Sequence, residues 1–249
     1  MQVRCAQCGA SLAVSADTRL LPCPYCATEL VVDGDGSLFH EVLVATVRED
    51  DARSHLRRFL AGDATVAGLD REARIGTPRL EYFPFWGFTL TEGAAERVVL
   101  MPAAPSSLQG LQGLQLPTGE SRAATPGLTG DSELVEPEIP VATAREWLAS
   151  KLPSAAERRV ALYHVPLWRI DYSWRSRTWH AAVEGVTGAV LPADYPAKSE
   201  APYRLIAALA LVLFGLEGLV VGNLLLKAAL YLVTSLPLLA AAWWVTRKV

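Results

Sequence analysis

Residues 162–174 read LYHVPLWRIDYSW, and residues 80–90 read LEYFPFWGFTL. Each stretch carries tyrosine, proline and tryptophan in the pattern Tyr-x-x-Pro-φ-Trp, where φ is apolar and the first copy is one residue shorter. The motif residues are Tyr82, Pro84, Trp86, Tyr163, Pro166 and Trp168. Aromatic and apolar residues at this density are typical of strands. The recurrence predicts two copies of one structural unit.

A candidate amphipathic helix precedes each copy of the motif. Apolar residues recur at helical spacing in both, at Ala52, Leu56, Phe59 and Leu60 and again at Ala144, Leu148 and Leu152. Both segments begin Val-Ala-Thr-x-Arg-Glu, which makes Thr46/Glu49 and Thr143/Glu146 candidate capping boxes. A second alignment pairs Ala52-Arg53 with Ala144-Arg145, and the sequence does not decide between the two. Chance similarity of two amphipathic helices is the alternative to a duplication.

The second motif leads into a predicted β-hairpin that turns at residues 175–177 and again at 185–188. We therefore expect an α+β domain over 37–197, made of degenerate repeats at about 40–100 and 141–192. Residues 101–140 are rich in proline and glycine. We expect them to form a long loop that joins the repeats and carries no chemistry.

The N-terminal segment contains all four cysteines of the chain, as Cys5-Ala-Gln-Cys8 and Cys23-Pro-Tyr-Cys26. Two C-x-x-C pairs at this spacing indicate one tetrahedral zinc ion. Disulfides and an iron–sulfur cluster are the alternatives, and a cytoplasmic location argues against disulfides. All four cysteines would be ligands, so we expect a structural ion with no open catalytic position.

The sequences VRCAQCGASLAV and LPCPYCATELVV resemble a zinc ribbon of the transcription-factor-B or rubredoxin-like kind, over about 32 residues. The resemblance implies a small ribbon domain at 1–36. One departure is Ala27, where many ribbons carry glycine after the last cysteine, which implies a slightly strained knuckle. Ribbons of this kind bind nucleic acid, recruit proteins or stabilise a small domain. Acidic residues outnumber the two arginines in 1–36, which argues against binding to phosphate.

The C-terminal segment contains two apolar runs, 205–221 and 224–245, separated by Gly222 and Asn223. Each run approaches the ~20 residues that a membrane-spanning helix needs. The pattern predicts a transmembrane helical hairpin over 203–246, and a buried hairpin in a soluble protein is the alternative. Basic residues flank the outer ends of the two runs and are missing from the turn, which places both termini in the cytoplasm. These residues are Lys198, Arg204, Arg247 and Lys248.

Glu217 and Lys227 are the charged residues within these apolar runs, and each lies five residues from Gly222. At ~1.5 Å per residue both reach a similar depth in the membrane. We expect an intramembrane ion pair that fixes the register of the two helices. A proton or ion relay is the alternative.

The whole chain is similar to bacterial membrane-anchored zinc-ribbon proteins, which join a ribbon, a Tyr-x-Pro-φ-Trp β region and C-terminal transmembrane helices. The resemblance implies an inner-membrane protein whose partners are membrane lipid and cytosolic or membrane proteins, of the stomatin/flotillin or phage-shock kind. It leaves self-association open. We expect a non-enzymatic adaptor, because the sequence has no phosphate loop, H-E-x-x-H or G-x-S-x-G motif. The alternatives are a membrane-tethered nucleic-acid-binding regulator and an enzyme with a pocket near His164, Arg169 and Asp171.

Overall fold

The computed structural model describes residues 2–15, 18–33, 36–92, 95–154, 156–198 and 201–248. The chain forms two compact units. Unit 1 contains residues 1–58 and 73–195, and unit 2 contains residues 59–72 and 196–249. The ribbon and the repeats therefore share unit 1.

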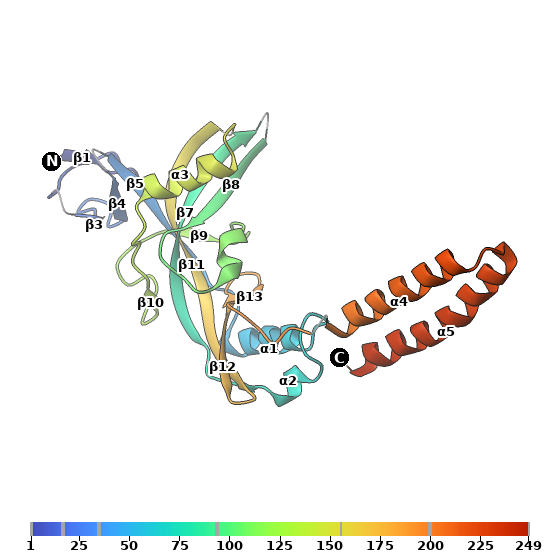
Figure 1. The fold of residues 1–249 in the computed structure, drawn as a ribbon. Helices are drawn as coiled ribbons and strands as arrows, with labels where there is room; N and C mark the ends of the chain where they lie inside the picture. Colours follow the sequence, from blue (N-terminus) through green and yellow to red (C-terminus); the bar gives the residue numbers. More distant parts are fainter. Residues whose placement is uncertain are drawn as a thin grey trace. The chain divides into compact units, whose positions relative to one another are not determined.

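Unit 1 is built on a large mixed sheet and a separate two-stranded sheet. Two long strands, β7 (Arg79–Glu92) and β11 (Ala156–Trp174), run antiparallel along their length and form the centre of the large sheet. Figure 1 shows them as long curved strands that lie side by side. The other strands of the large sheet are β3 (Leu20–Pro22), β4 (Glu29–Asp33), β5 (Gly36–Leu43), β6 (Arg74–Ile75), β8 (Ala95–Pro102), β9 (Ser121–Ala123), β10 (Glu133–Leu134), β12 (Arg177–Glu184) and β13 (Val190–Pro192). The α+β class agrees with the sequence prediction, whereas the large mixed sheet that joins the two repeats was not predicted.

Two helices and one 3-10 turn complete the described part of this unit. Helix α1 (Glu49–Leu60) precedes β7, and α3 (Val141–Lys151) precedes β11. The last two residues of α1 are assigned to unit 2. The 3-10 helix η1 (Gln109–Gly113) follows β8. Each long strand continues into an antiparallel return strand, β8 after β7 and β12 after β11. The arrangement of helix, long strand and return strand therefore occurs twice.

The short strands before the two helices exchange partners between the repeats. Strand β5, which precedes α1, pairs parallel with β11, and β10, which precedes α3, pairs parallel with β7. The order β10-β7-β11-β5 is therefore symmetric about its centre. From either end, a short strand that precedes a helix comes first, and the long strand of the other repeat comes next. Neither repeat completes its own sheet, so the two copies have to fold together.

Both motif prolines lie where a long strand changes its outer neighbour. Strand β7 pairs with β10 at Tyr82 and with β8 from Phe85 onward, and Pro84 lies between the two. Strand β11 pairs with β5 at His164 and with β12 from Leu167 onward, and Pro166 lies in that gap. Proline has no N–H to donate, so it is tolerated in a central strand only where a ladder bond is missing. The two motif prolines therefore occupy structurally equivalent positions in the two repeats.

The motif tryptophans tie each long strand to the helix of the other repeat. The Trp86 indole donates to the carbonyl oxygen of Ile139, two residues before α3 (2.8 Å). The Trp168 indole donates to the carbonyl of Val47, two residues before α1 (2.9 Å). This equivalence pairs Ala52 with Ala144, so the structure favours the second of the two predicted alignments.

The predicted capping boxes are wrong. Thr143 and Glu146 lie inside α3, whose N-cap is Pro140 without a side-chain capping bond. The Thr46 hydroxyl donates to the carbonyl of Val186 and does not cap α1.

Residues 101–140 differ from the predicted connecting loop. Proline and glycine keep most of the segment irregular, but β9 pairs with β5 and β10 pairs with β7. Its apolar side chains buried in the core that surrounds β7 and β11 are Met101, Ala103, Ala104, Leu108 and Leu111. The segment is part of the folded unit.

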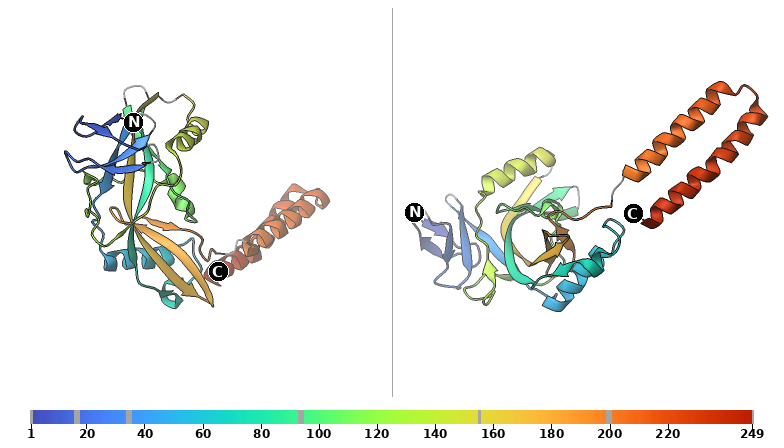
Figure 2. Two further views of the ribbon diagram at one scale, coloured as in Figure 1. Left: turned by 90° about the vertical axis from the view of Figure 1, so that its left-hand side faces the viewer. Right: turned by 60° about the horizontal axis from the view of Figure 1, so that its bottom comes forward.

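Unit 2 contains the short helix α2 (Leu69–Glu72) and the helices α4 (Ala201–Val220) and α5 (Leu224–Lys248). Helices α4 and α5 form an antiparallel hairpin, which both views of Figure 2 show. The side-chain oxygen of Asn223 accepts from the N–H groups of Leu225 and Leu226 and so caps α5. This confirms the predicted turn at residues 222–223.

Among the described residues, one segment is long and apolar enough to cross a membrane. It is Leu224–Trp244 of α5, with a mean hydropathy of 1.9 and none of it buried. The sequence therefore correctly predicted a C-terminal apolar helix that could serve as an anchor. The side chains of Arg247 and Lys248, which the predicted orientation uses, lie outside the described part of the chain.

Candidate metal centre

Two short hairpins position the four cysteines. The first knuckle joins β1 (Gln2–Arg4) to β2 (Ser11–Ala13), and the second joins β3 to β4. In each knuckle the N–H of the first cysteine donates to the carbonyl five residues later and closes the turn, from Cys5 to Ala10 (2.8 Å) and from Cys23 to Thr28 (2.8 Å). The equivalent geometry brings all four sulfurs to the same side of the two hairpins.

The sulfur atoms form one compact cluster, within 4.8 Å of one another. The sulfur of Cys5 lies 3.8 Å from that of Cys26, and the sulfur of Cys8 lies 3.8 Å from that of Cys23. A disulfide needs ~2.05 Å between sulfurs, so the cysteines are not bridged. A tetrahedron with metal–sulfur bonds of ~2.3 Å has edges of about 3.8 Å. The four thiols can therefore hold one metal ion, and their spacing fits zinc.

Hydrogen-bond donors in the second knuckle favour a thiolate at Cys26, whereas the pKa of Cys8 in the first knuckle is raised to about 12 among the neighbouring thiols. The Cys8 N–H donates to the sulfur of Cys5 (3.4 Å). Hydrogen bonds from the Thr28 side chain, and then from its backbone, lower the pKa of Cys26 to about 6. Metal binding requires deprotonated cysteine, so donors that lower a thiol pKa also favour the metal-bound form.

The residue after each second cysteine adopts left-handed backbone geometry. Gly9 has a φ of +77°, and Ala27 has a φ of +60°. An alanine in this region costs roughly 1–2 kcal/mol more than glycine would, because its Cβ approaches the following carbonyl. The strain predicted at Ala27 is therefore present in the second knuckle.

The ribbon attaches to the large sheet through β4, which pairs antiparallel with β5. The Ser37 hydroxyl joins β5 to the first knuckle, since it donates to the carbonyl of Arg4 (2.6 Å) and accepts from the N–H of Ala6 (2.9 Å). The metal centre is thus held against the edge of the repeat core.

A second constellation, which the sequence did not reveal, lies beneath the ribbon. The fully buried rings of His40 on β5 and His164 on β11 are joined by a hydrogen bond of 2.7 Å. The Nε2 of His164 also lies 2.8 Å from the carbonyl of Val135, and the Nδ1 of His40 lies 3.5 Å from a carboxylate oxygen of Glu29. Only His164 was singled out by sequence, because nothing local connects two histidines 124 residues apart.

The contacts of the pair assign its protons. A carbonyl can only accept, so His164 carries its proton on Nε2 and accepts from His40 on Nδ1. A neutral His40 then presents a bare Nδ1 toward Glu29. Burial lowers the pKa of His40 to about 3, with a contribution from His164, and lowers the pKa of His164 to about 4. Burial also raises the pKa of Glu29, which favours its protonated form opposite that nitrogen.

The three residues of the predicted alternative, an enzyme pocket, each contact other groups. His164 is sealed in the core, Arg169 lies 3.6 Å from Glu81, and Asp171 accepts from the ring of His180 (2.7 Å). The pockets beside β8, near residues 110–118 and beside Trp86 are lined by other residues.

The motif tyrosines are not equivalent. Tyr82 packs with Val42 and Ala124, whereas Tyr163 belongs to the main core around Phe85. The Tyr163 ring lies over Gly87, where a Cβ would overlap it. The prolines and tryptophans thus correspond between the repeats, but Tyr82 corresponds to His164 and not to Tyr163.

Glu217 on α4 and Lys227 on α5 each form a hydrogen bond with the neighbouring helix. In both cases the partner is a residue other than the opposite charged residue. The Lys227 ammonium donates to the carbonyl of Gly218 in the last turn of α4 (2.8 Å). The Thr234 hydroxyl lies 3.3 Å from a carboxylate oxygen of Glu217. The predicted direct ion pair is not among the contacts of the described residues. The charged residues join α4 to α5 as expected, but through a helix carbonyl and a hydroxyl.

No protein-family model, no curated protein and no solved structure matches the chain. The resemblance to bacterial membrane-anchored zinc-ribbon proteins therefore stays a prediction that rests on the cysteine pairs, the repeated motif and the C-terminal apolar runs.

Proposed function

We propose that the protein is a non-enzymatic membrane-anchored adaptor, which presents a zinc-stabilised ribbon to protein partners in the cytoplasm. The observation that carries the proposal is the four-sulfur cluster at one end of a chain whose other end is an exposed apolar helix. Zinc is the ion that four thiolates at this spacing favour. All four positions are then occupied by cysteine, so the ion has a structural role.

The ribbon offers a specific contact residue. Tyr25 lies at the tip of the second knuckle, and 73% of its side chain is exposed. In unit 1, the described residues include one other exposed large hydrophobic side chain, Trp147. Exposed aromatic residues are enriched at protein interfaces. We propose that Tyr25 contacts the partner, which belongs to the stomatin/flotillin or phage-shock kind of membrane-organising protein.

The proposal is tested by proteins that copurify with the full chain extracted from membranes. We expect at least one protein to be retained by the wild type and by Arg58→Ala, lost from Cys23→Ser, and reduced in Tyr25→Ala. Arg58 is the control because it is exposed on α1, away from the ribbon sequence. Identical partner lists for wild type and Cys23→Ser would remove the ribbon from the proposed function.

For the anchor, we propose two passes with both termini in the cytoplasm. A cysteine at Gly222 would then face the outside, whereas a cysteine at Lys198 would face the cytoplasm. Nothing lies within 4 Å of a Cβ at Gly222, so the substitution is tolerated. We expect a membrane-impermeant maleimide to label Gly222→Cys in intact cells, and Lys198→Cys, beyond the signal of the four native cysteines, only after permeabilisation. Labelling of Gly222→Cys only after permeabilisation would exclude two passes with both termini in the cytoplasm.

A further inference from the structure

A continuous groove lies beside β8 in unit 1. Two adjacent pockets, with volumes of about 480 and 380 Å³, share Met101, Gln112 and Lys151 among their lining residues. Strand β8 forms the floor, residues 111–116 form one wall, and the C-terminal part of α3 forms the other. Both volumes fall in the range of small-molecule sites.

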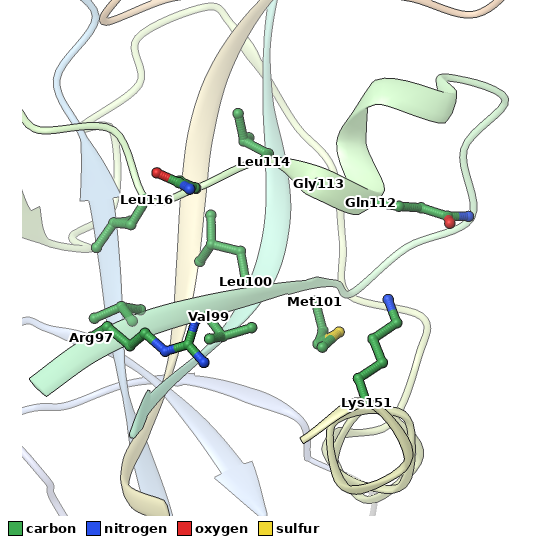
Figure 3. A pocket seen from close by; sticks show the side chains of 11 residues that line it. Arg97, Val99, Leu100, Met101, Gln112, Gly113, Leu114, Leu116 and Lys151 are labelled. Atoms are coloured by element: carbon green, nitrogen blue, oxygen red, sulfur yellow. The ribbon is translucent and has the colours of Figure 1, made fainter. Parts of the chain in front are cut away.

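The lining is apolar along most of the groove. Figure 3 shows Leu100 and Leu114 between Arg97 at one end and Lys151 at the other. The second pocket adds Leu108, Leu111, Ile139 and Trp147. Trp147 is 41% exposed, although large aromatic side chains elsewhere in the described part of unit 1 are mostly covered. A ligand that covered Trp147 and the half-buried Leu114 and Leu116 would remove their apolar area from water, whereas Leu100, Leu108 and Leu111 are already buried.

The charge of the lining selects the class of ligand. Arg97 and Lys151 are its charged residues, and neither pocket is lined by a carboxylate, although the whole chain has more acidic than basic residues. Lys151 belongs to both pockets, and it also lies at the C-terminal end of α3. A positive end beside an apolar channel complements an anionic head on an apolar chain.

We propose that this groove binds a linear anionic amphiphile, with its acyl chain along β8 and its carboxylate or phosphate on Lys151. The inference does not depend on the adaptor function or on the metal. A free fatty acid and a monoacyl phosphate share this chemistry, and both arise in membranes.

The test uses the full chain in phosphatidylcholine nanodiscs with palmitic acid that carries a photoreactive diazirine on its chain. We expect labelled peptides from β8, from residues 111–116 and from the end of α3. Labelling of α5, which contacts the bilayer, serves as the internal standard. Lys151→Glu is expected to reduce groove labelling about tenfold relative to that standard, the effect of losing one charge-assisted hydrogen bond. Arg58→Glu is the matched control and is expected to label like the wild type.

Competition by unlabelled amphiphiles distinguishes recognition of the charged head group from recognition of the acyl chain. Unlabelled palmitate and 1-palmitoyl lysophosphatidate are expected to displace the probe, and the stronger competitor identifies the head group. Hexadecanol, which is neutral, is expected to compete about tenfold less well. Lys151→Met keeps the length of the side chain and should remove this difference. The proposal is overturned if hexadecanol competes as well as palmitate in the wild type, or if Lys151→Glu labels the groove like the wild type.

Discussion

Replacing Cys23 by serine is expected to remove the metal ion and to unfold the ribbon. Cys23 is buried at 1% exposure, and its sulfur lies 3.8 Å from that of Cys8. The ribbon core is small, with Val3, Leu12, Val14 and Leu30 as its buried apolar residues beside two of the cysteines. A core of this size does not stabilise a fold alone, whereas a structural zinc contributes ~10–16 kcal/mol at neutral pH.

The measurement combines metal analysis with hydrogen exchange. The wild type is expected to hold one zinc per chain, and Cys23→Ser close to none. Amide protection should fall in residues 2–33 and persist along β7 and β11, because most of the core around those strands comes from outside the ribbon, with Val31 as its one buried ribbon residue among those described. Tyr25→Ala, which changes the same knuckle but no ligand, should keep both zinc and protection. One iron per chain would identify a different ion, and full protection in a metal-free Cys23→Ser would contradict a structural role.

The sequence was most informative where a local spacing fixes the chemistry. Two C-x-x-C pairs specify a cluster regardless of what surrounds them, and the structure brings Cys5, Cys8, Cys23 and Cys26 together. The turn at residues 222–223 was likewise predictable, because Gly222 and Asn223 interrupt an apolar run and Asn223 caps α5. The P-φ-W repeat also reflected a real structural equivalence.

The pairing of strands that are far apart in the sequence could not be predicted from the sequence. The parallel pairing of β5 with β11 joins segments from different repeats, and it brings His40 to His164. Composition was misleading at 101–140, because proline and glycine indicate a loop while Leu108 and Leu111 are buried. The equal predicted membrane depth of Lys227 and Glu217 suggested that the two would form an ion pair. The carbonyl of Gly218, in the last turn of α4, has no partner within the helix, and it accepts from the Lys227 ammonium instead.

The buried histidine pair is expected to make the protein strongly sensitive to acid. The folded pKa values are about 3 for His40 and about 4 for His164, whereas an unfolded histidine has a pKa near 6.5. The unfolded state therefore binds more protons below that pH. The contribution of the pair to stability is complete above pH ~6.5 and decreases as the pH falls, by up to about 2.7 kcal/mol per pH unit for both together.

The double substitution His40→Leu with His164→Gln is expected to flatten this dependence. Glutamine at 164 can still donate to the carbonyl of Val135, and leucine at 40 removes the bare nitrogen that faces Glu29. The measurement is the melting temperature of the zinc-loaded full chain between pH 8 and pH 5.5. Acid also protonates the metal ligands, but that effect is common to both proteins, so the difference between their slopes isolates the pair. His180→Gln, a change at a side chain that is 54% exposed, should keep the wild-type slope. Equal slopes for the wild type and the double variant would show that the buried pair takes up no protons on unfolding, and the assignment of two neutral rings would then be wrong.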